Sequence, residues 1–325
     1  MNTSEGGSAP LLSGTRERRR ATAAGTRATS GGAGRGKASA RTGASLFTSW
    51  NGKLVAGVLI GVVLCAAAIL APWLTPHDPN RQDLSAIRQP PVWMDGAWDH
   101  PLGTDSLGRD LLSRLLWSAR VAVTVALGAT LCTAVIGTPV GLASGYFRGR
   151  LDTFLMRVVD VWMSIPAVLL AIALMAVLGV GLLKVILAIV LVDWTRFARV
   201  IRGEVLALRE REFVEASRAI GLGPFRIMAE ELLPNLVPLL IVLASLEMAI
   251  AVGVEALLSF VGLGVEAAVP SWGSMIAEGR GYLLVGWWGM TLPMLALVVT
   301  VVGFNLLGEG LRERLDPRLR TEAAR

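Results

Sequence analysis

The sequence predicts an all-α integral membrane protein with six transmembrane helices. Hydrophobic residues make up 53% of the 325 residues, above the apolar share of ordinary soluble domains, and the mean hydropathy is +0.58. The uncharged range 54–74 would form a helix of about 31 Å, which matches the thickness of a bilayer core. We therefore expect this range to be the first of the membrane spans.

Five further ranges are predicted to cross the membrane. The ranges 121–147 and 161–183 contain no charged residue, and the less uniform ranges 185–206, 235–261 and 285–307 complete the set. Gly137, Gly141 and Gly145 recur at four-residue steps in the second span, and such small residues let a neighbouring helix approach closely. Pro139 and Pro166 are expected to distort the second and third spans.

The distribution of charge predicts the orientation of the chain. The first fifty residues hold eight basic and two acidic side chains, which places the N-terminus in the cytoplasm by the positive-inside rule. Six spans return the C-terminus to the same side. The composition of residues 1–50, rich in Gly, Ala, Ser and Thr, favours a disordered basic tail over a nucleic-acid-binding segment or a targeting signal.

The predicted organisation has five parts. Residues 1–50 are the cytoplasmic tail, 51–75 the first transmembrane helix, and 76–112 an extracytoplasmic loop rich in Pro, Asp and Trp. A five-helix core follows over 113–310, and residues 311–325 form a cytoplasmic C-terminal tail. Within the core, residues 207–234 are a charged segment between two apolar ranges.

This charged segment is predicted to form two short helices on the cytoplasmic surface. The first runs over 212–219 and ends at Gly221, because glycine readily takes the left-handed conformation that ends helices. The second runs from Pro224, a residue favoured in the first turn of a helix, to Leu233, and is stopped by Pro234. A compact polar pair of helices between membrane spans is a surface on which another protein can sit.

The same residues resemble the "EAA" loop of ABC importer permeases. The match consists of Glu215-Ala216-Ser217, three further residues, Gly221, and then Leu233-Pro234. The resemblance implies that this loop docks on a cytoplasmic ATPase through Glu215, Ala216, Ser217, Arg218, Gly221, Leu233 and Pro234. Two positions depart from the family pattern: Ser217 replaces an alanine, and Glu231 stands where an apolar residue is usual.

Three further strings resemble the second of the two permeases in dipeptide, oligopeptide and nickel importers. They are HPLGTDSLGRDLLSRLLWSARVAV from His100, EALLSFVGLG followed by PSWGSMIAEG over 255–279, and FNLLGEGLRERLDPRLR over 304–320. The resemblance implies a type I ABC importer permease fold in a bacterial inner membrane. It also implies a second homologous permease subunit, two cytoplasmic ATPases and an extracytoplasmic solute-binding protein. The solute would be a peptide, with nickel, haem or another small solute as the alternative.

The outer motif offers candidates for contact with a partner. Asp105, Arg109 and Asp110 lie in the string that begins at His100, and they could contact the binding protein or the second permease. The alternative is local capping of the second span from Leu107 onward, by Asp105 or Ser106.

Three acidic residues fall inside predicted spans: Asp193, Glu247 and Glu255. A charge at the bilayer centre costs about 2.5–3.5 kcal/mol on insertion scales, so such residues usually face a protein interior or a watery cavity. All three are candidates for the translocation pathway. We expect Glu247 either to line it and favour solutes with a positive charge or free amine, or to be a protonated carboxyl or form a buried hydrogen bond to the partner subunit. Asp193 lies three residues before Arg196, a spacing that predicts an ion pair within one helix.

Several catalytic and metal-binding possibilities are set aside. Residues 31–37 have the spacing of a phosphate loop, but Ala38 replaces the Ser or Thr that would hold magnesium. ATP and magnesium are therefore expected on partner ATPases, with no cofactor, metal or catalytic residue in this chain. His77 and His100 have no nearby Cys or regularly spaced carboxylates, so neither is assigned to a metal. Two other classes remain open: an ion-gradient-driven transporter with Glu247 and Asp193 as proton sites, or a membrane scaffold.

Overall fold

The computed structural model describes residues 52–315, and this part of the chain is almost entirely helical. Its regular elements are α1 (Gly52–Leu74), η1 (Leu84–Ala86), η2 (Val92–Met94), α2 (Leu111–Phe147), α3 (Gly149–Met163), α4 (Ala167–Leu178), α5 (Leu182–Leu208), α6 (Glu212–Ala219), α7 (Pro224–Arg226), η3 (Ile227–Leu232), α8 (Leu233–Phe260), α9 (Trp272–Arg280) and α10 (Trp288–Leu315). The predicted tail over 1–50 and most of the predicted tail over 311–325 lie outside the described residues.

Four helices of the described part are long and apolar enough to cross a membrane: α1, α2, the continuous helix Pro224–Phe260, and α10. The pair α3 and α4 supplies a fifth crossing if the two are one broken span. Helix α5 has the length of a span, with 27 residues. It falls outside the apolar set because it carries charged side chains such as Asp193 and Arg196, which pair with each other.

The predicted third span, 161–183, is interrupted. Helices α3 and α4 meet at a bend of 83°, and Pro166 occupies the position just before α4. Proline has no N–H to continue the helical hydrogen bonds, and it disfavours helical geometry in the preceding residue. The expected distortion at Pro166 is therefore a complete break, and α4 ends at Leu178, before the predicted end of the span.

The glycines of α2 form the predicted surface of close helix contact. A Cβ atom on Gly141 would lie 2.7 Å from the carbonyl oxygen of Ala198, and one on Gly145 would lie 2.7 Å from Cβ of Val205. A Cβ on Gly137 would lie 2.5 Å from the carbonyl oxygen of Trp194. Because α5 runs directly along these glycines, the close-contact prediction is confirmed, and α5 is held firmly against α2.

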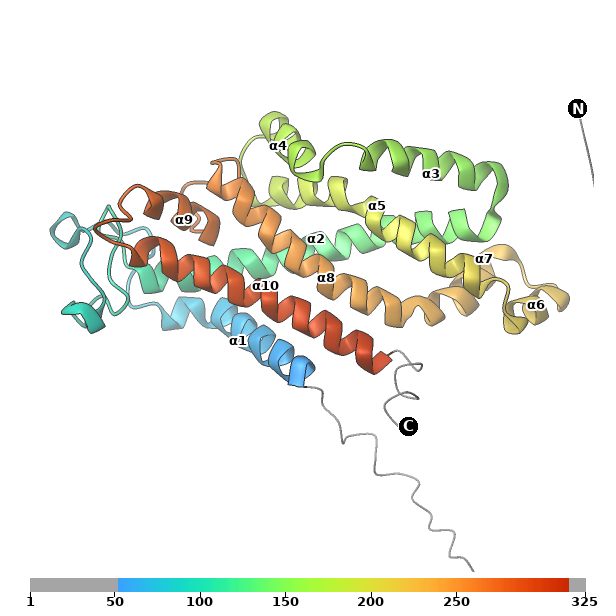
Figure 1. Cartoon of the computed structure of the whole chain (residues 1–325), viewed down its shortest axis with the longest axis horizontal. Helices are drawn as coiled ribbons and strands as arrows, with labels where there is room; N and C mark the ends of the chain where they lie inside the picture. The colour runs from blue at the N-terminus through green and yellow to red at the C-terminus, as the bar shows by residue number, and fades with distance from the viewer. Residues whose placement is uncertain (1–51, 316–325) are drawn as a thin grey trace, which may run out of the picture. The chain divides into compact units, whose positions relative to one another are not determined.

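The two ends of the long helices carry different structures (Figure 1). The segment between α1 and α2 lies at one end together with α9, which we call the loop end. Helices α6 and α7 lie at the opposite end, which we call the coupling end. The residues between α1 and α2, called the outer segment below after their predicted side of the membrane, thus lie at the end of the long helices opposite α6 and α7.

Candidate functional site

The coupling segment consists of α6, the turn after it, and α7 with η3. Gly221 has a φ of +85°, the left-handed conformation expected of a glycine that ends a helix. Its N–H donates to the carbonyl oxygen of Arg218 at 3.0 Å, and the N–H of Leu222 donates to that of Ser217 at 3.1 Å. These bonds satisfy carbonyl groups that the end of α6 would otherwise leave free. The predicted turn at Gly221 is confirmed.

The second short helix does not end at Pro234 as the sequence predicts. It runs through η3, a π-helical turn, and continues as α8 to Phe260. In η3 the N–H of Leu233 donates to the carbonyl oxygen of Met228, five residues earlier. Such a wide turn displaces the carbonyl that Pro234 would otherwise meet in a regular helix. The proline is thus accommodated, and the coupling segment is continuous with a long apolar helix.

Buried side chains anchor the coupling segment to α2 and α5. Val214, Ile227 and Leu232 have no exposed surface. They share a hydrophobic cluster with Phe197 and Ile201 of α5, among others. A displacement of the segment therefore has to move α5 and α8 or break this cluster.

The outward face of the coupling segment is partly apolar. Ile220 is 77% exposed and Phe225 76% exposed, and Glu215 and Ala216 are also exposed. Ile220, at the end of α6, and Phe225, in α7, are thus two large apolar side chains exposed on a charged segment. Exposed apolar side chains at this place are compatible with a docking surface, although single exposed apolar residues are common on proteins.

The two departures from the usual loop pattern contact each other. The hydroxyl of Ser217, which is buried, donates to Oε1 of Glu231 at 3.2 Å. The bond joins α6 to η3. Glu231 therefore has a partner inside the segment, and the hydroxyl that Ser217 adds relative to alanine is also satisfied.

Aromatic and cationic side chains connect the segment to the end of α2. The guanidinium of Arg218 lies 5.3 Å from the ring centroid of Tyr146, and that of Arg209 lies 5.9 Å from it. Phe225 contacts Phe147 edge to face, at 6.2 Å between ring centroids. Burial lowers the pKa of Arg209, and the neighbouring charges of Arg148 and Arg218 add to this effect.

Asp193 and Glu247 lie together, whereas Glu255 is elsewhere on α8. Arg196 donates to Asp193 and to Glu247, each at 3.1 Å, which confirms the predicted ion pair within α5. Glu247 is only 1% exposed. Glu255 is buried and accepts a hydrogen bond from Ser259 at 2.6 Å, so it contributes to local structure rather than to this cluster.

A pocket of 170 Å³ opens beside this charged cluster. Asp193 and Arg196 line it together with Trp162 and Pro166, at the break between α3 and α4. The indole of Trp162 donates to the carbonyl oxygen of Leu191 at 2.6 Å, which fixes this wall of the pocket. Two charged groups in the middle of α5, Asp193 and Arg196, thus line a pocket.

At the loop end, four charged side chains form a compact network. Asp105 accepts from Arg109 Nε at 2.6 Å and contacts Arg114. Glu278 of α9 accepts from Arg109 at 2.6 Å and from Arg114 at 2.9 Å. Burial, followed by the charges of Asp105 and Glu278, raises the pKa of nearby Tyr282 to about 12. Two cations and two anions thus join the outer segment, α2 and α9.

Sequence reasoning did not identify Arg114 and Glu278. Both lie in strings that resemble the permease family, but they are 164 positions apart, so no local spacing indicates their contact. The predicted partner-facing residues Asp105, Arg109 and Asp110 are all buried. Their side chains are paired within the chain, and their contact with the binding protein or the second permease stays a prediction.

The cap of α2 also differs from the prediction. The helix begins at Leu111 rather than Leu107, and Asp110 is its N-cap, accepting from the N–H of Ser113 at 2.8 Å. Asp105 instead accepts from the N–H groups of Leu107 and Arg109 and so closes the preceding turn. Asp110 also lies beside two histidines to which the sequence assigned no role, His77 and His100.

The fold and these sites define a helical membrane permease with a coupling segment at one end. The family described as "binding-protein-dependent transport system inner membrane component" matches residues 137–321, and "N-terminal TM domain of oligopeptide transport permease C" matches residues 54–91. The chain belongs to this family of binding-protein-dependent permeases. It is therefore a non-catalytic, multi-pass inner-membrane subunit of an ABC importer, and such importers include ATPases and a substrate-binding protein.

Relatives and solved structures agree with this assignment. The chain is 38% identical to the di/tripeptide transport system permease protein DppC of Pseudomonas aeruginosa, over 84% of this chain and 90% of that protein. It is 38% identical to the dipeptide transport system permease protein DppC of Bacillus subtilis, over 83% of each. The fold is similar to an inward-facing MetNI methionine ABC transporter, with a TM-score of 0.53 and 24% identity over 63% of this chain and 98% of that one.

Proposed function

We propose that this chain forms half of the translocation pathway of a di- or oligopeptide importer, beside a second homologous permease. Its relatives are named as permeases for dipeptides, for di/tripeptides and for glutathione, which supports a peptide as the solute. Membership of a binding-protein-dependent family favours ATP-driven import over ion-gradient-driven transport or a scaffold role. Both termini and the coupling end face the cytoplasm in this proposal, as the basic N-terminal residues indicate.

The observation that carries the coupling role is the exposed apolar pair on an anchored segment. Ile220 and Phe225 project from α6–α7, while Val214 and Ile227 beneath them are packed against α5. A partner ATPase that holds this pair would transmit its closure through the buried cluster to α5 and α8. The ATPases supply ATP and magnesium binding. This chain contributes the docking surface, with Glu215 beside it as a contact for a basic side chain.

Uptake in reconstituted membranes tests the proposed solute. The full importer, with its binding protein, is placed in proteoliposomes that contain ATP, and labelled dipeptides, tripeptides, nickel and haem are compared. ATP-dependent accumulation of the peptides supports the proposal. Accumulation of nickel or haem without peptide uptake would contradict the proposal and would identify nickel or haem as the solute.

The charged cluster at the pocket is proposed to bias uptake toward positively charged peptides. One arginine faces two carboxylates, Asp193 and Glu247, so the cluster retains a negative charge when both are ionised. Replacing Glu247→Gln is expected to slow uptake of cationic peptides about two- to tenfold relative to neutral ones, which corresponds to the loss of roughly one hydrogen bond or charge contact. Initial uptake rates of matched cationic and neutral peptides measure this ratio.

Glu255→Gln is the matched control, because Glu255 is equally buried on the same helix but contacts Ser259 instead. It is expected to leave the ratio of the two uptake rates unchanged, even if less protein accumulates. If Glu247→Gln left the ratio of cationic to neutral peptide uptake unchanged, the cluster would not be part of the translocation pathway.

A further inference from the structure

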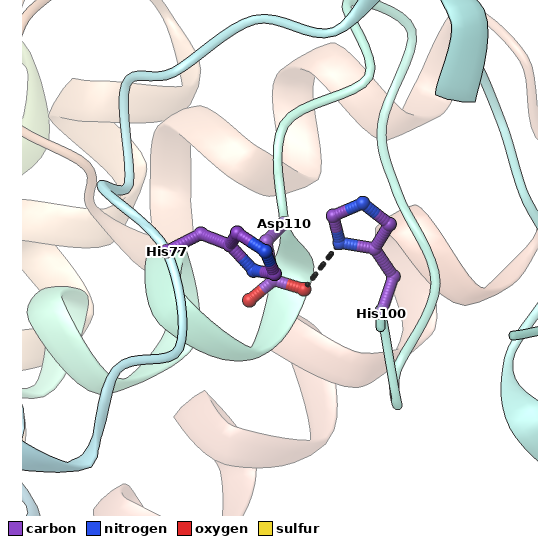
Figure 2. A group of neighbouring side chains, drawn as sticks. All are labelled: His77, His100 and Asp110. Atoms are coloured by element: carbon purple, nitrogen blue, oxygen red, sulfur yellow. Dashed lines mark hydrogen bonds and ion pairs between the residues drawn. The ribbon is translucent and has the colours of Figure 1, made fainter. Parts of the chain in front are cut away.

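Three side chains at the loop end converge on one point (Figure 2). His77 follows α1, His100 lies in the outer segment, and Asp110 caps α2; each offers a ligand atom, and these atoms lie within 4.8 Å of one another. The ring centroids of the two histidines are 4.8 Å apart. We propose that His77, His100 and Asp110 bind one divalent transition-metal ion, which joins the start of the outer segment to the first turn of α2.

The donor set fits this class of ion. Two imidazoles and one carboxylate suit borderline metals such as Zn²⁺, whereas Mg²⁺ and Ca²⁺ prefer oxygen ligands alone. A tetrahedral zinc ion with bonds of about 2.1 Å holds its ligand atoms roughly 3.4 Å apart. His100 Nδ1 and Asp110 Oδ1 are already 3.1 Å apart. The widest separation in the group, 4.8 Å, would have to contract by about 1.4 Å to reach this spacing.

The polar atoms of the cluster are only partly satisfied without an ion. His77 Nδ1 is buried and has no hydrogen-bond partner, and an orphaned buried polar atom of this kind requires an explanation. His100 Nδ1 is paired with Asp110, but the Nε2 atoms of both rings lack close partners. His77 Nε2 is 3.7 Å and His100 Nε2 is 3.9 Å from the carboxylate of Asp99, distances too long for good hydrogen bonds.

The surroundings provide a route for the ion and a candidate fourth ligand. The carboxylate of Asp99 faces both rings and is 76% exposed, and the side chain of His77 is 21% exposed. An ion can therefore enter from the solvent beside Asp99, which then closes the open side of the site. The second oxygen of Asp110, Oδ2, accepts a hydrogen bond from the N–H of Ser113. The helix cap and the metal contact therefore use different atoms.

The ion would add a direct link between His77, His100 and the first turn of α2. The backbone N–H of His77 reaches Ser113 Oγ at 3.3 Å, and His100 reaches α2 through Asp110. A metal bond between them would hold the outer segment against the same helix turn that precedes Arg114. The metal would thus stabilise the surface of the permease at the loop end.

Zinc titration of the full-length chain tests the proposal. The chain has 2 histidines, so with a purification tag free of histidine every imidazole ligand must come from this site. The chelator-stripped protein in lipid nanodiscs is titrated with Zn²⁺ against a chromophoric chelator, and with Co²⁺ for its visible absorption. We expect one equivalent per chain, a tetrahedral cobalt spectrum, and a higher melting temperature with Zn²⁺ than after chelation.

Variants separate metal binding from folding. Asp110→Asn keeps the N-cap, because asparagine caps helices as well as aspartate, but removes the charged ligand; we expect affinity to fall on the order of 100-fold. His77→Gln should have a similar effect. Asp95→Asn, an exposed carboxylate of the same segment with φ +65°, should bind as the native chain does. Absence of binding in the native chain, or binding retained by the double variant His77→Gln/His100→Gln, overturns the proposal.

Discussion

Replacing Gly221→Val is expected to lower ATP-dependent uptake about tenfold while the chain remains inserted in the membrane. The cause is the backbone conformation of Gly221, with φ +85°. A steric clash is not the cause, because a Cβ atom at this position would meet no other atom within 4 Å. A non-glycine residue in the left-handed region costs about 1–3 kcal/mol, most for a β-branched one. The segment would relax to another turn, and Ile220 and Phe225 would no longer project together. Uptake and stimulated ATP hydrolysis in proteoliposomes measure the loss.

Gly223→Val is the control for this experiment. A Cβ atom on Gly223 would also meet no other atom within 4 Å, but the φ of this residue is −68°, which valine adopts readily. We expect near-native uptake from this variant, and an intermediate value from Gly221→Asn because asparagine tolerates the left-handed region. Equal uptake by Gly221→Val and Gly223→Val would show that the turn geometry does not matter for coupling.

Replacing Arg114→Met is expected to lower the free energy of unfolding by about 3–5 kcal/mol, the usual result of removing one partner from a buried ion pair. Arg114 is 2% exposed and Asp105 1% exposed. Without Arg114, the two carboxylates of the network share one arginine, Arg109. The midpoint of thermal denaturation of the purified chain in nanodiscs measures this change.

Arg120→Met provides the comparison on the same helix. Arg120 is exposed and stacks on Trp117, with 4.9 Å between its guanidinium and the ring centroid, so its loss should cost about 1 kcal/mol or less. The double variant Arg114→Met/Asp105→Asn should recover part of the stability lost in Arg114→Met, because it removes one of the two carboxylates that would then share Arg109. Strictly additive losses would contradict a coupled network.

Local patterns in the sequence predict much of this architecture. The turn at Gly221, the break at Pro166, the glycine face of α2 and the pairing of Asp193 with Arg196 all depend on residues within a few positions of one another. The membership of the permease family was also predictable from short strings. Each of these signals reflects a constraint that the backbone or one helix imposes locally.

The features that the sequence did not predict depend on contacts between distant segments, or on a local change in helix geometry that accommodates a proline. Arg114 meets Glu278 only because α9 folds back onto the start of α2. His77, His100 and Asp110 meet because an irregular segment returns to the N-cap of α2. Pro234 fails to end its helix because a π-helical turn just before it accommodates the ring. None of these arrangements has a fixed spacing along the chain.

The docking of the coupling segment is tested most directly by site-specific photo-crosslinking in native membranes. A benzophenone side chain replaces Phe225 at the coupling end or, as the control, Leu284, which is 99% exposed between α9 and α10 at the loop end. We predict that position 225 captures the ATPase subunit, identified by mass spectrometry, and that position 284 does not. Capture of the ATPase from position 284, or its absence at 225 in an importer that still takes up peptide, would contradict the proposed docking surface.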